Sequence, residues 1–461
     1  MSDIIIRNGL IVTDSKKFTA DIKIKDGKIV EIGKKIITEN ETIINADGLT
    51  ILPGGIDPHV HLSLPDYVPA EFQWSDNFTS GSKAALAGGI TTLGCISVPD
   101  KDESPLGTLK RESKSINQQA IADIMIHPVI FTPTDNTIEE IPQLIKEGCS
   151  TIKVFMVTDD YDDNTANYVK AIQVAGDNGM LSMIHCEDNK IIKETCDQMI
   201  SEGRGDLAHY ADSRPLESEV VATQSAIAIC EKTNAPIYIV HLSSEGALKE
   251  CEKAQKQSLP VYVEGRPIFL YLSREEYEKP EGPMYVVQPP LREKSDNKAL
   301  WKGLNKGSIH TLATDHAPHT REQKMNPSLN IKKLVPGINE LQVMLPMFYH
   351  KGVLGNKITL EQFVSLTSTN IAKLFGIYPQ KGTIQVGSDA DLVIWDFEEE
   401  REIRDEDMYS QAGFSIYHGQ KYKGWPKITI RRGEIVFKER KIIAKPGSGQ
   451  VLKRGKTQRL I

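Results

Sequence analysis

Eight short apolar runs, separated by segments with helical spacing, limit the possible folds of this chain more than any other feature. The runs lie at residues 54–62, 89–97, 124–131, 150–156, 180–186, 236–242, 259–265 and 308–315. Runs of this kind are typical of parallel strands buried on both faces. Segments between them, such as EEIPQLIKEG and ANYVKAIQVAGDNG, end near Gly, Asn or Lys as helix C-termini do. Eight strands with intervening helices over about 260 residues predict a closed (β/α)8 TIM barrel.

The two ends of the chain alternate apolar and polar residues instead. The N-terminal part contains the segments DIIIRNGLIVTD and ADIKIKDGKIVEIG, and Asp26-Gly27 in the second segment signals a hairpin turn. The C-terminal part contains the segment WPKITIRRGEIVFKE. We expect both ends to join in one composite β-sandwich. The predicted organisation is a sandwich formed by 1–52 and 380–445, a barrel over 53–379, and a solvated or subunit-contacting tail over 446–461.

Composition narrows the class of protein. The chain has 55 Lys and Arg against 62 Asp and Glu, so its formal charge of −7 gives no reason to expect a nucleic-acid partner. No segment is apolar enough to indicate a membrane span or a signal peptide. The six cysteines lack CxxC spacing and predict neither a disulfide framework nor a thiolate zinc site. We therefore expect a cytoplasmic protein without a membrane partner.

Side chains that can bind metal lie where the predicted strands end, at the face that carries the active site of a barrel. His59 and His61 end the first strand, and positions i and i+2 share a face, so both imidazoles can reach one ion. Four further residues end other strands: Lys153, His185, His241 and Asp315. Imidazole and carboxylate ligands are typical of zinc-class ions, so these residues predict a metal site.

Lys153 does not fit such a site as an ordinary ammonium group. With a reference pKa of about 10.4 it is protonated and repelled by a divalent cation. Either Lys153 points elsewhere as an ion-pair partner, or it has been converted to an anion. His127, early in the third run, provides a contrast, and we expect it to be a hydrogen-bonded core histidine.

An ordered set of motifs covers essentially the whole chain: PGGIDPHVHL, STIKVFM, MIHCED, YIVHLSSEGAL, ATDHAPH and AKLFGIYPQKGTIQVGSDADLVIWD. In this set the chain resembles the cyclic amidohydrolases, which comprise hydantoinases, dihydropyrimidinases, allantoinases and dihydroorotases. The resemblance implies the same barrel with a composite β-sandwich, and a homotetramer or homodimer. It also implies a small cyclic amide as the substrate and an N-carbamoyl amino acid as the product.

The resemblance further implies two divalent ions, expected to be zinc. His59 and His61 would bind one ion, His185 and His241 the other, and Asp315 would ligate the first. Lys153, carboxylated on its amine, would bridge both ions, which removes the conflict with an ammonium group. Asp315 would also be the catalytic acid and base, accepting a proton from the attacking water and returning it to the leaving nitrogen.

Substrate contacts are predicted from departures from the family pattern. Ser63 stands where dihydroorotases have an arginine, which disfavours an anionic ring. The segment DYVPAEFQWSDNFTSGSKAALAGGITT looks more like hydantoinases and dihydropyrimidinases. Thr158 stands where those enzymes have a tyrosine, Tyr161 follows three residues later, and Gln288 replaces a serine. The full set of candidate substrate-binding residues is Ser63, Thr158, Tyr161, Gln288, His319 and Asn339.

We therefore expect a hydantoinase or dihydropyrimidinase, with a dihydroorotase or allantoinase using the same mechanism as the alternative. Two other classes remain open. One is a catalytically silent scaffold related to dihydropyrimidinases, which would lack ligands that are all present here. The other is a barrel deaminase with one ion and a glutamate acid, which Lys153 disfavours. The number of bound ions, about two, one or none, separates the three classes.

Overall fold

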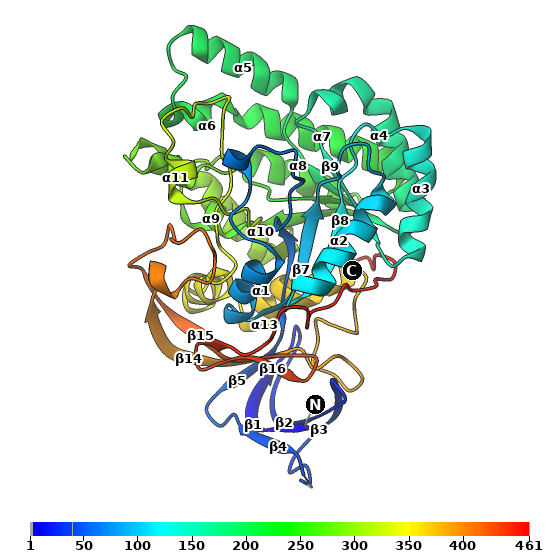
Figure 1. Cartoon of the computed structure of the whole chain (residues 1–461), viewed down its shortest axis with the longest axis vertical. Coiled ribbons are helices and arrows are strands. Elements are labelled where there is room, and N and C mark those ends of the chain that lie inside the picture. Colours follow the sequence, from blue (N-terminus) through cyan, green and yellow to red (C-terminus); the bar gives the residue numbers. More distant parts are fainter. Residues whose placement is uncertain (1–2, 39, 461) are drawn as a thin grey trace.

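The predicted barrel is present in the computed structural model, which describes residues 3–38 and 40–460 (Figure 1). Within these residues its strands are β6 (Gly55–Val60), β7 (Ile90–Ser97), β8 (Asp123–Pro128), β9 (Thr151–Phe155), β10 (Leu181–His185), β11 (Ile237–Ile239), β12 (Val261–Gly265) and β13 (Thr311–Leu312). β6 to β8 form one parallel segment and β9 to β13 another. Parallel bridges at Val129–Lys153 and Val60–His316 join the two segments at both edges, so the barrel is closed.

Helices follow the strands and cover the outside of the barrel (Figure 1). The long helices are α1 (Phe78–Ala87), α2 (Pro105–Gln119), α3 (Asp135–Lys146), α4 (Asp159–Asp177), α5 (Asn189–Ser201), α7 (Leu216–Thr233), α8 (Glu245–Lys256) and α10 (Lys294–Lys306). Shorter ones are α6 (Tyr210–Ser213), α9 (Pro267–Tyr271), α11 (Arg321–Lys324), α12 (Met344–Phe348), α13 (Leu360–Val364) and α14 (Asn370–Leu374). Polar caps fix where they begin: the Ser244 side chain accepts a hydrogen bond from the amide of Ala247 at the start of α8. None of these described helices is long and apolar enough to cross a membrane.

Both chain ends build one mixed sheet, as expected. Its strands are β1 (Ile4–Val12), β2 (Lys17–Lys25), β3 (Lys28–Gly33), β4 (Thr42–Asn45), β5 (Thr50–Pro53), β14 (Leu392–Glu402), β15 (Lys421–Arg431), β16 (Glu434–Lys438) and β17 (Lys441–Ile442). Antiparallel pairing of β5 with β14 joins the two ends. Asp26 and Gly27 turn between β2 and β3 with positive φ of 49° and 77°, as a tight hairpin requires.

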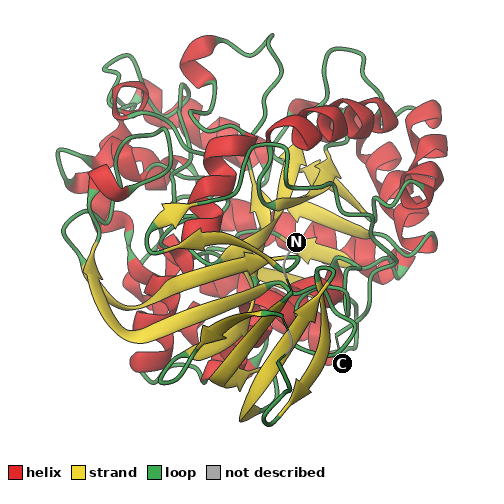
Figure 2. Ribbon diagram, turned by 60° about the horizontal axis from the view of Figure 1, so that its bottom comes forward, coloured by secondary structure: helices red, strands yellow, loops and turns green. Residues whose placement is uncertain are grey.

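The composite sheet is packed against the barrel, and Figure 2 shows its strands in front of the barrel. Residues on β14 alternate between two cores because successive side chains of a strand point to opposite faces. Val393 and Trp395 belong to the hydrophobic core shared with the barrel, whereas Leu392 and Ile394 belong to the core of the sheet itself. This packing covers the amino-terminal end of the barrel strands. The carboxyl-terminal end is left for a functional site.

The C-terminal segment, for which we expect a solvated or subunit-contacting tail, makes backbone contacts with the barrel. Val451 forms a parallel bridge with Ile124, and the amide of Arg454 donates to the carbonyl of Gly148 over 2.8 Å. The Arg454 guanidinium is buried and donates to the carbonyl of Ile126 and the hydroxyl of Thr151. Backbone hydrogen bonds and burial therefore hold this segment against the amino-terminal end of β8 and β9.

Candidate metal and active site

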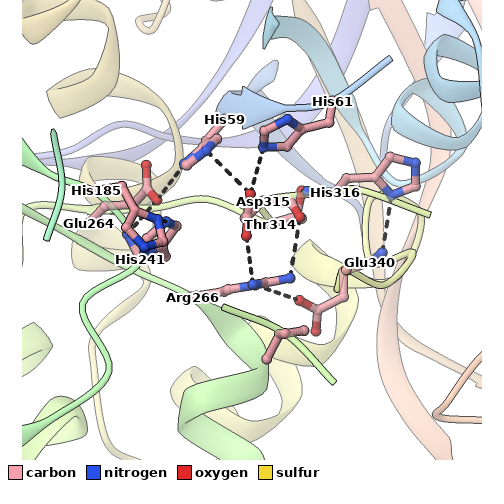
Figure 3. A network of polar contacts seen from close by, with 12 residues as sticks. His59, His61, His185, His241, Glu264, Arg266, Thr314, Asp315, His316 and Glu340 are labelled. Carbon is pink, nitrogen blue, oxygen red and sulfur yellow. Dashed lines mark hydrogen bonds and ion pairs between the residues drawn. The ribbon is translucent and has the colours of Figure 1, made fainter. Parts of the chain in front are cut away.

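The predicted metal-binding residues gather at the carboxyl end of the barrel strands (Figure 3). His59 lies in β6, His61 directly after it, and His185 is the last residue of β10, while His241 and Asp315 follow β11 and β13. Lys153 lies in β9, next to these strand ends. All six side chains are buried. The residues come from five strands, so the closed barrel brings together groups that are up to 256 positions apart in the sequence, counted from His59 to Asp315 (315 − 59).

His59, His61 and Asp315 form the first half of the cluster. Nε2 of His61 lies 2.8 Å and Nε2 of His59 lies 3.3 Å from Oδ1 of Asp315. Nδ1 of His59 donates to Oε1 of Glu264 over 2.9 Å, because a carboxylate only accepts. Nε2 of His59, which Glu264 does not engage, faces a carboxylate oxygen of Asp315. An imidazole nitrogen and a carboxylate oxygen that face each other in this way can ligate one cation.

His185 and His241 form the second half. Nε2 of His185 lies 2.8 Å from Oε2 of Glu187, and Arg214 donates to both oxygens of Glu187 over 2.9 and 2.6 Å. Burial opposes ionisation of Glu187, but the Arg214 guanidinium holds the pKa of that carboxyl well below its usual range. His185 consequently carries its proton on Nε2 and turns the lone pair of Nδ1 toward Nε2 of His241, 3.1 Å away. This spacing also suits two ligands of one ion.

Lys153 lies beside both halves. Its side chain is fully buried, and its Nζ has no hydrogen-bond partner among the described residues. Nζ stands 4.7 Å from the ring centre of Phe155, and its charge contributes to lowering the pKa values of His61 and His241. Burial lowers the pKa of Lys153 to about 8. A buried amine without a partner is costly, so the position fits a group that acquires further bonds.

Burial also sets the protonation of the imidazoles. It lowers the pKa of His61 to about 4 and that of His241 well below its ordinary value. Neutral imidazole is the form that binds metal. Burial alone would raise the pKa of Asp315. The Arg266 guanidinium and the neighbouring imidazoles nevertheless hold this pKa well below its usual range. The site therefore offers neutral nitrogen ligands and an ionised carboxylate, the donor set of zinc-class ions.

Two of the predicted residues have a strained backbone. His241 has a φ of 38° and Asp315 a φ of 49°, both in the left-handed region that non-glycine residues rarely adopt. Such conformations cost about 1 to 3 kcal/mol each and persist where the surroundings enforce them, most often at functional sites. The main-chain amide of His241 is fixed by Oε1 of Glu264 over 2.7 Å.

A pocket of about 350 Å³ opens above the cluster. His59, His61, His185, His241 and Asp315 form its floor. Its walls are mainly apolar and aromatic: Leu64, Phe72, Trp74, Val98, Phe131, Phe155, Val157, Ala317, Val335, Pro336 and Gly337. Among the described lining residues there is no Lys or Arg. The pocket therefore suits a small, largely apolar ligand with a polar group directed at the floor.

The structure divides the candidate substrate contacts into two groups. Thr158, Gln288 and His319 line the pocket. Ser63, Tyr161 and Asn339 are not among the described lining residues, and their contact with a ligand stays a prediction. The Ser63 hydroxyl donates to Glu112, the Tyr161 ring packs against Tyr168, and the Asn339 amide donates to the carbonyl of Phe414.

Sequence reasoning overlooked the residues that orient the cluster. Glu264 and Arg266 stand at the end of the seventh apolar run, so the rule that inspects strand ends could have found both. Glu187 stands two residues after His185 in MIHCED and gave no separate signal. His127 has the position expected of a core histidine: it is fully buried, and its Nδ1 lies 2.6 Å from the Thr151 hydroxyl.

A closed (β/α)8 barrel that gathers four imidazoles, a lysine and a carboxylate at its carboxyl-terminal mouth has the architecture of the metal-dependent barrel hydrolases. Residues 50–436 match the amidohydrolase family, and the chain belongs to that family. This finding confirms the resemblance seen in the motifs.

Several curated relatives carry the name D-hydantoinase, and two of them illustrate the similarity. The one from Ralstonia pickettii is 36% identical over 98% of this chain and 99% of its own length. The one from Geobacillus stearothermophilus is also 36% identical, over 98% of this chain and 96% of its own length. Among solved structures, the dihydropyrimidinase of Brevibacillus agri NCHU1002 superposes with a TM-score of 0.94 at 33% identity and covers 99% of this chain and 100% of its own. The L-hydantoinase of Arthrobacter aurescens gives a TM-score of 0.90 at 29% identity, covering 98% and 100%.

Proposed function

We propose that this chain is a metal-dependent cyclic amidohydrolase of the hydantoinase and dihydropyrimidinase type. It opens the ring of a hydantoin or dihydropyrimidine at an amide bond and releases an N-carbamoyl amino acid. The observation that carries the proposal is the pair of facing ligand atoms, Nε2 of His59 and Oδ1 of Asp315, on the floor of an apolar pocket. The full-length relatives named D-hydantoinase support the same reaction class.

The cluster provides places for two divalent ions, with zinc as the expected metal. His59, His61 and Asp315 would hold one ion, because their ligand atoms all lie within 4.8 Å of one another. His185 and His241 would hold the other. Such ions, when bound, lower the pKa of water and polarise a carbonyl group.

Lys153 would complete both sites after carboxylation. With a pKa of about 8, a fraction of its side chain is a neutral amine at neutral pH, and only the neutral amine is nucleophilic. The neutral nitrogen would form a bond to the carbon of CO₂ and release one proton, which gives an anionic carbamate. Counted from the ammonium form, two protons are released and the charge changes from +1 to −1. This change removes the conflict between a buried ammonium group and two divalent cations.

Asp315 is the group that can move the proton. Its carboxylate lies on the pocket floor, and its ionised state makes it an acceptor for a proton of the attacking water. After attack on the ring carbonyl, the proton passes from Asp315 to the ring nitrogen as the carbon–nitrogen bond breaks. The apolar walls exclude bulk water and so strengthen the electrostatic interactions at the floor.

The pocket favours an uncharged ring. A dihydroorotate-type substrate carries a carboxylate that is normally held by a cation, and the described pocket lining has no Lys or Arg. Aromatic walls from Phe72, Trp74, Phe131 and Phe155 instead suit a ring with an apolar substituent.

A substrate panel tests the proposal. Purified protein, with its metal content measured, is incubated with hydantoin, a 5-substituted hydantoin, dihydrouracil, allantoin and dihydroorotate, and the ring-opened product is quantified. We expect about two ions per chain and turnover of the hydantoins and dihydrouracil. Exclusive turnover of dihydroorotate would contradict the substrate class, and protein that binds metal but opens none of the rings would contradict the reaction.

The resemblance also leads us to propose a homotetramer or homodimer in the cytoplasm. Support comes from apolar side chains left exposed on the composite sheet module, such as Ile37 and Ile43, 81% and 51% exposed. The six cysteines are free and buried, as in a protein of a reducing compartment. Light scattering of the purified protein gives the oligomeric state, and a monomer at micromolar concentration would contradict it.

A further inference from the structure

Arg266 is a fully buried arginine next to the candidate metal cluster. It follows the last residue of β12 and stands two positions after Glu264, so one strand end contributes both side chains. It is not among the residues that line the pocket. Burying a guanidinium is costly unless charged partners compensate it, so its partners indicate its role.

The partners of Arg266 are two acidic residues, Asp315 and Glu340 (Figure 3). Nη1 donates to Oδ2 of Asp315 over 2.7 Å, and Nη2 donates to the main-chain oxygen of the same residue over 3.3 Å. Nε lies 3.8 Å from Oε2 of Glu340. The guanidinium therefore binds both the side chain and the strained main chain of Asp315.

The two carboxylate oxygens of Asp315 consequently have different partners. Oδ2 is occupied by Arg266, whereas Oδ1 faces Nε2 of His61 at 2.8 Å and Nε2 of His59 at 3.3 Å. Without the guanidinium, partial rotation about the last side-chain bond of Asp315 would turn the carboxylate plane and move both oxygens from these positions. Arg266 thus fixes the plane of the carboxylate, with one oxygen directed at the two imidazoles.

A second layer holds Arg266 in turn. The Tyr417 hydroxyl donates to Oε1 of Glu340, and the Glu340 amide donates to Nδ1 of His316 over 3.3 Å. Tyr417 belongs to the connection between β14 and β15 of the composite sheet. All of these groups are buried. A continuous polar network therefore runs from the composite module to the carboxylate of Asp315.

We propose that Arg266 is a positioning residue that fixes Asp315 with Oδ1 toward His59 and His61 and Oδ2 away from them. The inference rests on the proposed function, because it assumes that Oδ1 binds the first ion and serves in proton transfer. Arg266 acts only through Asp315. Its loss should change turnover and metal affinity without changing how the pocket binds the ring.

Two variants test the inference. Arg266→Met keeps about the length of the side chain but removes every donor, and Arg266→Lys keeps the charge but supplies one nitrogen in place of three. Loss of a residue that orients a metal ligand typically costs about 10- to 100-fold in metal affinity or activity. We expect a fall in kcat of that size for Arg266→Met and a smaller fall for Arg266→Lys. KM should stay within about twofold in both variants.

Zinc affinity is measured independently of turnover, by titrating metal-free protein against a zinc-competing indicator. We expect about tenfold weaker binding of one of two ions in Arg266→Met. Arg454→Met is the matched control, since it also removes a buried guanidinium but at the opposite end of the barrel. The control should lose thermal stability yet keep the zinc affinity and kcat of the unmodified protein.

The outcomes separate the inference from the function on which it rests. If the unmodified protein neither binds zinc nor opens a ring, the proposed function fails. If it does both and Arg266→Met matches it in kcat and zinc affinity, the positioning role is wrong. Equal losses in Arg266→Met and Arg454→Met would also overturn the role, because they would follow from stability alone. Should Arg266→Met not fold, unchanged kcat and zinc affinity in Arg266→Lys would contradict the role.

Discussion

Oε1 of Glu264 accepts a hydrogen bond from Nδ1 of His59 over 2.9 Å. The same oxygen also accepts the main-chain amide of His241 over 2.7 Å. One carboxylate oxygen therefore fixes the tautomer of an imidazole in the first half of the cluster and the backbone of an imidazole in the second half. The two halves are therefore held in a common frame, and such outer contacts tune the ligands of a metal.

Glu264→Gln tests this link. The amide has nearly the same shape and keeps one oxygen that can accept both hydrogen bonds, but the negative charge is lost, which weakens the hydrogen bond from His59. We expect the affinity for both ions to fall about 10- to 100-fold, measured by zinc titration of metal-free protein. Glu250→Gln on α8, which removes an ion pair with Lys253 on the outside of the barrel, is the control and should bind zinc normally. Loss of one ion with normal binding of the other would show that Glu264 does not join the halves.

Lys153→Ala addresses the bridging role. We expect the variant to lose bound metal and ring-opening activity together, because the anionic carbamate can no longer form. Metal content is measured by elemental analysis after purification in bicarbonate buffer. Lys381→Met, which removes a buried lysine bound to Asp123 and Asp391 far from the cluster, should lower stability but retain metal. Full metal occupancy and normal turnover in Lys153→Ala would refute the bridge.

The barrel, the composite sheet and the candidate metal cluster follow from local sequence patterns. Strand ends in a barrel share one face, so the positions of His185 and His241 could be predicted without knowing their partners. The orientation of individual side chains could not be predicted in this way. Tyr161 follows the N-cap of α4 and turns toward Tyr168, and Asn339 satisfies a distant carbonyl, which depends on packing between segments. The ion pair between Arg266 and Glu340 likewise depends on packing between distant segments.

The contacts of the C-terminal segment could not be predicted from the sequence for a different reason. Its Lys, Arg, Gly and Ser residues have the composition of a solvated tail. Its stability comes instead from main-chain hydrogen bonds, such as that of Gly455 with Gly376, and from burial of Leu452. Backbone contacts of this kind carry almost no side-chain signal, and they become visible only with the fold.

Acid should destabilise the protein through His310, which lies outside the metal cluster. Burial lowers the pKa of His310 to about 4, against an ordinary value of 6.5. Between these values the unfolded chain binds a proton that the folded chain does not, so stability falls as the pH drops from 6.5 toward 4. The loss is at most about 3 kcal/mol. This contribution of His310 to acid destabilisation should be absent from His310→Asn. The side-chain oxygen of the asparagine can still accept a hydrogen bond from the Val263 amide. Urea unfolding of both proteins from pH 7 to pH 4 provides the comparison, and parallel stability curves would contradict the assignment.

Phe131→Ala tests whether the pocket walls select the substituent of the ring. Phe131 lines the pocket, is 38% exposed at its mouth, and stacks on Phe155 with ring centres 6.3 Å apart. Removing the ring deletes apolar contact worth about 1 to 2 kcal/mol, so we expect KM for a 5-aryl hydantoin to rise about 5- to 30-fold. KM for unsubstituted hydantoin and kcat for both should change by less than about threefold, since the floor of the pocket is untouched. Phe397→Ala, which alters an aromatic stack in the composite sheet against Tyr349, is the control for general destabilisation. An equal rise in KM for both substrates would show that Phe131 contributes to ring binding in general and does not distinguish the substituent.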